Sequence, residues 1–170
     1  IGNATQIFVH TLDEPSTFAR ICAALETLDL TIYDARIYSD TDGSTLDTFF
    51  VLQSDGASLD SHPDTFLEIQ ARIRQHLSES ELKPVSRHTP RTVKAFTIPT
   101  TVHFSQDETS HLTTLEVTTA DRPGLLARLG SVLSRYDISV QGAKIQTLGE
   151  RVQDIFFLAN AAGGQLKDDA

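Results

Sequence analysis

TADRPGLLARL, residues 119–129, contains the sharpest change of pattern in this chain. A strand-like run from Leu115 ends at Thr119, a turn follows, and apolar residues at helical spacing begin directly after it. The pattern predicts a strand, a tight turn and a helix. Free N–H groups at a helix start favour a small anionic group, and Gly124 has no side chain to obstruct one. A turn that only caps the helix is the alternative interpretation.

The chain contains this pattern twice, 108 residues apart. Ten of the 34 positions in residues 6–39 are identical to their counterparts in 114–147. With one gap, residues 47–50 (DTFF) also match residues 154–157 (DIFF). Similarity at a fixed period predicts a duplicated domain.

Each copy is predicted to have the same order of elements. In the first copy we expect strands at 6–11, 30–39 and 45–52, a closing strand at 96–104, and helices at 17–28 and from 61 onward. In the second copy we expect strand 112–119, helix 124–136 and strands 138–147 and 152–160, after which the sequence stops. The predicted fold class is α+β, with two tandem ferredoxin-like βαββαβ units, the second incomplete at its C-terminus. The first domain is expected over 1–106, with a polar connector at 79–95, and the second over 107–170.

Finer features follow from the same patterns. The apolar face of the helix after residue 61 should be buried, and it consists of Phe66, Ile69, Ile73 and Leu77. A change of alternation phase inside the second strand of each copy predicts β-bulges at 33–34 and 141–142. Bulges often re-aim side chains beside binding sites, so we expect each one to border the same pocket as the turn of its copy. A correction of strand twist without any ligand is the alternative.

Composition excludes several classes of function. The formal net charge is −9, and the only basic cluster is the short segment 83–94, so a nucleic-acid partner is disfavoured. Because Cys22 is the only cysteine, an internal disulfide is excluded. The sequence has no apolar run of about 18 residues, so no membrane span is predicted. The six histidines lack metal-ligand spacing, and no nucleophile–base set can be assigned. The chain has no methionine and begins at Ile1, so we expect a non-catalytic, cytoplasmic piece of a longer protein, without a metal or cofactor.

Residues 121–126 (DRPGLL), the helix after them and residues 138–145 (ISVQGAKI) resemble the ACT domain family, whose members commonly sense amino acids. Residues 34–37 (DARI), 47–52 (DTFFVL) and 149–156 (GERVQDIF) look more narrowly like the C-terminal tandem ACT region of bacterial bifunctional uridylyltransferase/uridylyl-removing enzymes. Those enzymes modify the PII nitrogen-regulatory protein. The resemblance implies a regulatory module that senses glutamine and controls upstream catalytic domains of the same chain, with another ACT unit as a further partner.

The turn and the resemblance together predict an effector site in the second copy. It comprises Asp121, Arg122, Pro123, Gly124, Leu125, Leu126, Gln141, Gly142 and Ala143. A weaker site is predicted in the first copy, where Ser16 replaces the glycine, at Asp13, Pro15, Ser16, Tyr33, Asp34 and Ala35. The rival hypothesis is a structural module that joins domains or subunits without a ligand.

Overall fold

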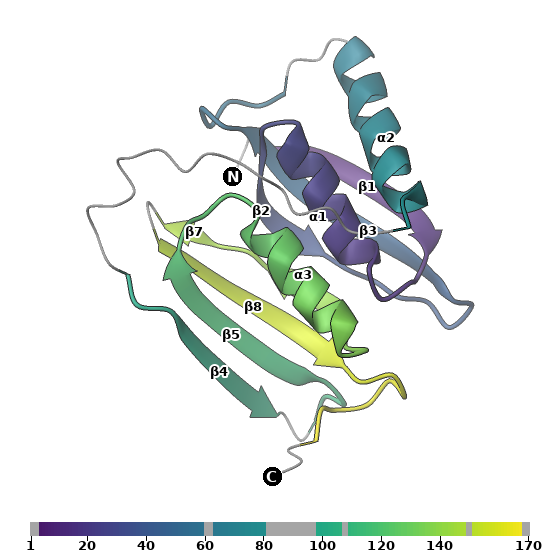
Figure 1. The fold of residues 1–170 in the computed structure, drawn as a ribbon, viewed down its shortest axis with the longest axis vertical. Coiled ribbons are helices and arrows are strands. Elements are labelled where there is room, and N and C mark those ends of the chain that lie inside the picture. The colour runs from purple at the N-terminus through teal and green to yellow at the C-terminus, as the bar shows by residue number, and fades with distance from the viewer. Residues whose placement is uncertain (1–3, 60–62, 81–97, 107–108, 149–150, 168–170) are drawn as a thin grey trace.

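The computed structural model describes residues 4–59, 63–80, 98–106, 109–148 and 151–167. Helices and strands are mixed along the chain, as the α+β prediction requires (Figure 1). In chain order the elements are β1 (Thr5–Leu12), α1 (Thr17–Thr27), β2 (Leu30–Arg36), β3 (Ser44–Gln53), α2 (Pro63–Ser78), β4 (Thr101–Gln106), β5 (Thr113–Ala120), α3 (Leu125–Arg135), β6 (Ser139–Lys144), β7 (Thr147–Leu148) and β8 (Arg151–Ala159).

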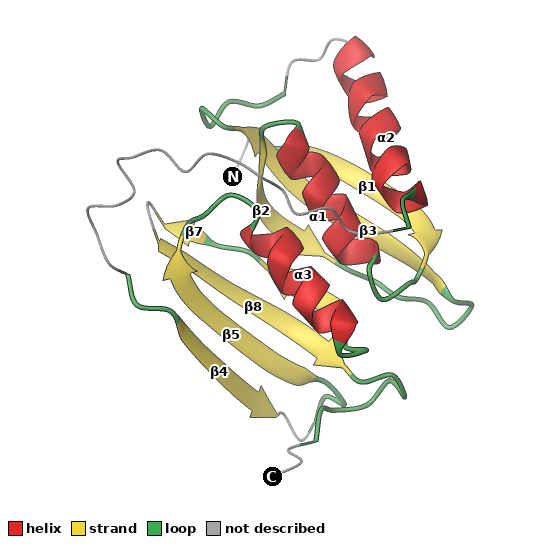
Figure 2. Ribbon diagram, viewed as in Figure 1, coloured by secondary structure: helices red, strands yellow, loops and turns green. Residues whose placement is uncertain are grey.

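The strands form one antiparallel sheet in the order β1-β3-β2-β6-β8-β5-β4, with the short β7 paired to β8. Helices α1, α2 and α3 lie on one face of this sheet (Figure 2). The first half of the chain supplies β1-β3-β2 and the second half supplies β5-β8-β6, so in each set the strand that comes last in the sequence lies between the other two. The predicted α+β class is therefore confirmed.

The halves meet at the centre of the sheet, where β2 pairs with β6 through Ala35 and Ala143. These two alanines are counterparts in the sequence, 108 residues apart. An antiparallel pair of equivalent residues places a local two-fold axis between them. On the helical face, α1 packs against α3, and Gly130 allows the approach: a Cβ there would lie 2.8 Å from the Cβ of Ala19.

Local features recur in both halves. The register of β2 against β3 shifts between Ile32 and Asp34, and that of β6 against β8 shifts between Val140 and Gly142. Both predicted bulges are confirmed. The helix ends also correspond, because the residue that follows each C-terminal turn is an aspartate with positive φ, 60° at Asp29 and 54° at Asp137. Aspartate tolerates this left-handed conformation better than most residues.

Strand β4 corrects the prediction for residues 96–104. Residues 96 and 97 lie outside the described residues, and Thr101–Gln106 pairs with β5 of the second half instead of closing the sheet of the first. This position beside β5 is where a ferredoxin-like unit has its fourth strand. Alternation predicts that a segment is a strand but does not specify its neighbour. Every residue of β4 is exposed, including Val102 and Phe104 at 55% each.

The same placement explains a second correction, on α2. Ile69 and Ile73 are buried as predicted, but Phe66 is 46% exposed and Leu77 is only partly buried. Among the described strands β1 pairs with β3 alone, so its outer edge has no strand to cover these side chains. A groove of about 410 Å³ runs between β1 and α2.

The apolar core joins both halves. Phe18 of α1 has its ring centroid 6.2 Å from that of Phe49 on β3 and 6.2 Å from that of Phe156 on β8. Phe49 and Phe156 are counterparts in the two halves and are fully buried. One aromatic side chain of the first half therefore packs against equivalent rings of both halves.

Candidate functional site

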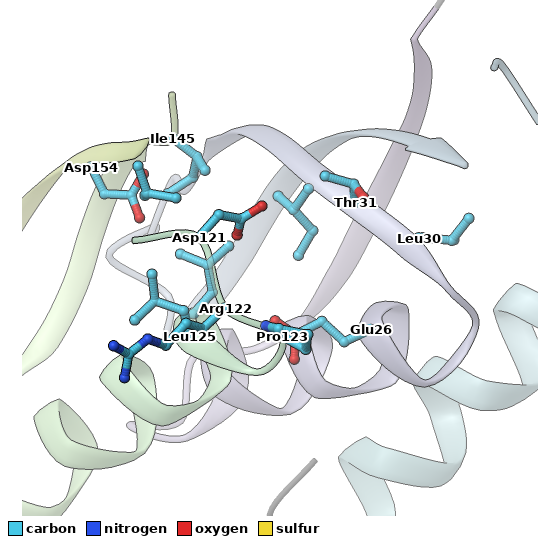
Figure 3. A pocket seen from close by; sticks show the side chains of 12 residues that line it. Glu26, Leu30, Thr31, Asp121, Arg122, Pro123, Leu125, Ile145 and Asp154 are labelled. Atoms are coloured by element: carbon cyan, nitrogen blue, oxygen red, sulfur yellow. The ribbon is translucent and has the colours of Figure 1, made fainter. Parts of the chain in front are cut away.

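A cavity of about 130 Å³ lies between the halves, beside the turn that precedes α3. The second half contributes Asp121, Arg122, Pro123, Leu125 and Leu126 from the turn and helix start, Ile145, and Val152 and Asp154 from β8. The first half contributes Glu26 from α1 and Leu30, Thr31 and Ile32 from β2. In Figure 3 the side chains of Asp121 and Asp154 lie on one side of this space, across from Leu30 and Thr31.

Asp154 is the most unusual residue of the cavity because it is a fully buried acid on a strand. Its Oδ1 accepts a hydrogen bond from the backbone N–H of Gln146 at 3.2 Å, whereas its buried Oδ2 has no hydrogen-bond partner among the described residues. Burial raises the pKa of this carboxyl to about 7, against the effect of the Gln146 hydrogen bond, and the charge of Asp121 adds to the rise. The group can therefore change its charge near neutral pH.

Asp121 brings a second carboxyl to the same space. Its side chain is exposed at the mouth of the cavity, yet desolvation still raises its pKa, opposed by a backbone hydrogen bond from Arg122. With Glu26, three acidic side chains line the cavity and Arg122 is the single basic one. The lining is thus suited to a group with positive charge.

The helix start supplies the opposite polarity. Helix α3 begins at Leu125 without a side-chain cap, so its first turn presents backbone N–H groups and the positive end of the helix dipole. The N–H of Leu125 is already donated to the carbonyl of Arg122 at 3.1 Å. Gly124 has φ 79° and is not among the residues that line the cavity. Its glycine is therefore explained by a left-handed turn rather than by space for a ligand.

The other predicted residues of the second-half site lie elsewhere. Gln141 is the bulged residue and its amide donates to Ser139 Oγ at 3.1 Å. Gly142 faces Phe157, whose Cδ2 would be 3.1 Å from an added Cβ, and Ala143 forms the central pair with Ala35. The structure therefore brings most of the turn residues to the cavity, but not residues 141–143.

The predicted first-half site has an equivalent position with almost no space. A cavity of about 10 Å³, room for at most about one water molecule, is lined there by Asp13, Glu14, Pro15, Thr17, Phe18, Ile37, Thr45, Asp47, Ser139 and Val140. Ser16 instead accepts a hydrogen bond from Arg20 at 2.8 Å, and Asp34 pairs with Arg36 at 3.7 Å. Tyr33 is the bulged residue of β2, and Ala35 lies in the central pair.

The sequence reasoning missed the residues that distinguish the cavity, above all Asp154 and its counterpart Asp47. A signal was present, because Val152, Phe156 and Leu158 alternate on one face of β8 and Asp154 falls on that same buried face. An acid at a core position of a strand indicates either a hydrogen-bonded structural role or a site. The contribution of β2 required knowledge of how the halves pack.

Among the described residues, no group of three or more histidine, cysteine, aspartate or glutamate side chains could hold a metal ion. None of the helices in that part of the chain is long and apolar enough to cross a membrane.

Comparisons with known proteins show similarity to one family of regulatory domains. Residues 113–165 match the model of the ACT domain. Over 166 residues the chain is 42% identical to the bifunctional uridylyltransferase/uridylyl-removing enzyme of Pseudomonas putida (strain GB-1), covering 96% of this chain and 18% of that protein. The enzyme of the same name from Pseudomonas aeruginosa (strain UCBPP-PA14) is 40% identical over 168 residues, covering 98% and 19%.

The chain thus spans less than a fifth of the length of these curated relatives. A crystal structure of an unknown protein from Galdieria sulphuraria overlaps with a TM-score of 0.35 at 14% identity, covering 92% of this chain and 80% of that one.

Proposed function

We propose, on the match of residues 113–165 to the model of the ACT domain, that the chain is an amino-acid-sensing regulatory module. Its ligand, glutamine, binds in the cavity between the halves. The module controls the catalytic domains of a bifunctional uridylyltransferase/uridylyl-removing enzyme, which would lie elsewhere in a longer chain. Glutamine is the amino acid that the resemblance of residues 34–37, 47–52 and 149–156 implies.

The observation that carries this proposal is the buried carboxyl of Asp154 at the wall of a cavity, because one of its oxygens has no hydrogen-bond partner in the described part of the chain. An unpaired buried polar atom costs roughly 1–3 kcal/mol of folding free energy. Such an atom at the wall of a cavity marks a candidate binding position, because a ligand there can supply the missing partner. The ammonium group of an amino acid can donate hydrogen bonds to this oxygen and compensate its charge.

The remaining walls suit the other parts of a zwitterion. The start of α3 offers positive polarity to a carboxylate. Leu30, Ile32 and Ile145 supply apolar surface for the carbon chain. A cavity of about 150 Å³ is large enough for the six carbon atoms of benzene. The space here, about 130 Å³, therefore has room for the charged end of an amino acid, and a glutamine side chain would extend toward the exposed Asp121 and Arg122.

A ligand in this position would contact both halves at once. Leu30, Thr31 and Ile32 belong to the first half, whereas the turn and β8 belong to the second. Binding would therefore stabilise one particular packing of α1 and β2 against the second half, which gives a physical route by which occupancy reaches attached domains. The common strand order and the equivalent positions of the cavities support a duplicated ACT unit as the origin of both halves.

Calorimetric titration of the 170-residue chain with glutamine, glutamate and asparagine tests this function. We expect saturable binding of glutamine and weaker binding of the other two. At about 100 times the Kd, a ligand raises the free energy of unfolding by about 2.7 kcal/mol, which corresponds to a rise in Tm of roughly 5–10 °C for a chain of this length. Absence of binding by any amino acid would refute the proposal. Alone, the chain should neither transfer nor remove uridylyl groups.

A docking module without a ligand is the second candidate, and the edges of the sheet favour it. Large apolar side chains are exposed on β1, at Phe8 and Leu12, and on β4, at Val102 and Phe104. Both strands pair on one side only within the described sheet. Exposed edges with apolar side chains are suited to pairing with another strand. An unchanged Tm in saturating amino acid, together with self-association by sedimentation, would favour this candidate.

A further inference from the structure

We infer that Asp154 binds the ammonium group of the ligand, and that the residue two positions before it on the strand determines whether this carboxylate can bind a ligand. The inference rests on the proposed function, because it assigns the recognition chemistry of the same cavity. It makes Asp154 and Val152 the residues that determine specificity. Both residues lie on β8, outside the turn that precedes α3.

The small cavity of the first half can be compared directly with the larger cavity to which Asp154 belongs. Every residue that lines the small cavity of the first half has its counterpart, in the other half, among the residues that line the larger one. Asp47 corresponds to Asp154, and both are buried acids on equivalent strands. Burial is the largest cause of the raised pKa in each, about 6 for Asp47 and about 7 for Asp154. The two sites therefore differ in the groups around a common carboxyl.

One hydroxyl group is the main polar difference. Asp47 accepts hydrogen bonds from the Oγ1 of Thr45 and from the backbone N–H of Tyr38. At the equivalent place Asp154 accepts a hydrogen bond from the backbone N–H of Gln146. The counterpart of Thr45 is Val152, whose side chain has no hydrogen-bond donor. The carboxylate of the first half thus accepts one hydrogen bond more from the protein, whereas that of the second half has an oxygen without a partner among the described residues, which a ligand can use.

The apolar difference acts in the same direction. Phe18 lines the small cavity, and its ring packs against Phe49 and Phe156. Its counterpart in the larger cavity is Leu126, a smaller side chain. The two cavity volumes, about 10 Å³ and about 130 Å³, differ in the direction that this exchange predicts. Phe18 narrows the first site, and Thr45 donates a hydrogen bond to its carboxylate. Both differences favour ligand binding in the second half.

The experiment compares glutamine with 4-carbamoylbutanoate, which is glutamine without its amino group. Both are titrated into the 170-residue chain and into Asp154→Asn and Val152→Thr, and the fold of each variant is checked by circular dichroism. We expect the parent chain to bind glutamine at least tenfold more tightly than the analogue. Asp154→Asn should remove most of that preference. Val152→Thr should lower the affinity for glutamine by tenfold or more, because the new hydroxyl group donates a hydrogen bond to the carboxylate of Asp154.

Matched controls use the first half. Asp47→Asn and Thr45→Val make comparable changes at the closed site and should leave the affinity for glutamine within about twofold of the parent. Equal affinity of the parent chain for glutamine and the analogue would overturn the assignment even if no variant folded. Unchanged glutamine binding by folded Asp154→Asn would overturn it while leaving the proposed function in place. If the parent bound no amino acid, both proposals would fall.

Discussion

The contact between α1 and α3 gives a prediction in which two known effects have opposite signs. Gly130 lies within α3, and an alanine there would improve helix propensity by about 0.8–1.0 kcal/mol. The added Cβ would, however, lie 2.8 Å from the Cβ of Ala19, 3.0 Å from its Cα and 3.1 Å from Cδ1 of Phe18. Carbon atoms in contact normally lie about 3.5–4.0 Å apart. The nearest pair must therefore separate by roughly 0.7 Å or more.

The cost of this separation should exceed the gain in propensity. Ala19 is fully buried and one of the close atoms is its backbone Cα, so no side-chain rotation relieves the contact. Overpacking a core by one methyl group typically costs about 1–3 kcal/mol. After the gain in propensity is subtracted, Gly130→Ala should lower the free energy of unfolding by about 0–2 kcal/mol.

Urea denaturation of the chain, followed by circular dichroism, measures this difference. Ala19→Gly removes one of the clashing atoms, so the double variant should be more stable than the sum of the two single changes predicts. If Gly130→Ala instead raised the free energy of unfolding by about 1 kcal/mol, as propensity alone predicts, the close packing of α1 against α3 would be refuted.

Three further changes test the site and the core. Because burial raises the pKa of Asp154 to about 7 and of Asp47 to about 6, the folded state binds more protons than the unfolded state between about pH 4 and 7, and stability should fall as the pH rises through this window. Asp154→Asn leaves Glu26, Asp121 and Arg122 in place and should reduce the change in the free energy of unfolding between pH 5 and pH 8, measured by urea titration. An unchanged pH dependence would contradict the burial of that carboxyl. Phe18→Ala should cost about 3–5 kcal/mol by the same assay, because its ring packs against both halves, and a loss below about 1 kcal/mol would contradict the shared core. Gly124→Val should cost about 1–3 kcal/mol, since φ is 79° there, whereas Gly124→Asn should cost less; equal losses would show that backbone strain is not the cause.

Much of the fold could be predicted because the sequence patterns report local geometry. Alternation phase located the bulges at Ile32/Asp34 and Val140/Gly142, and turn chemistry located the start of α3 within one residue. The partner of β4 could not be predicted in this way. Its alternation is compatible with an edge strand of either half, and the choice of β5 depends on long-range packing.

The site was harder to predict because its walls come from both halves. Local sequence predicts the turn residues that line the cavity, since a helix start can be recognised there. They are Asp121, Arg122, Pro123, Leu125 and Leu126, without Gly124. Leu30 and Thr31 reach the cavity only because β2 pairs with β6, a contact between residues more than 100 positions apart. Residues 141–143 were expected beside the turn because they form a bulge, but the bulge directs Gly142 against Phe157 instead.

The central pair of Ala35 and Ala143 makes the molecule resemble a symmetric dimer within one polypeptide. In a dimer of identical subunits every substitution occurs on both sides of the axis, so a change that closes one cavity also closes the other. Here the two sides are encoded separately. Thr45 and Val152 can therefore differ. Asp47 accepts a hydrogen bond from Thr45, whereas Asp154 keeps an oxygen without a partner among the described residues. The covalent link also keeps the two sides together at any dilution, so the response to a ligand would not depend on protein concentration.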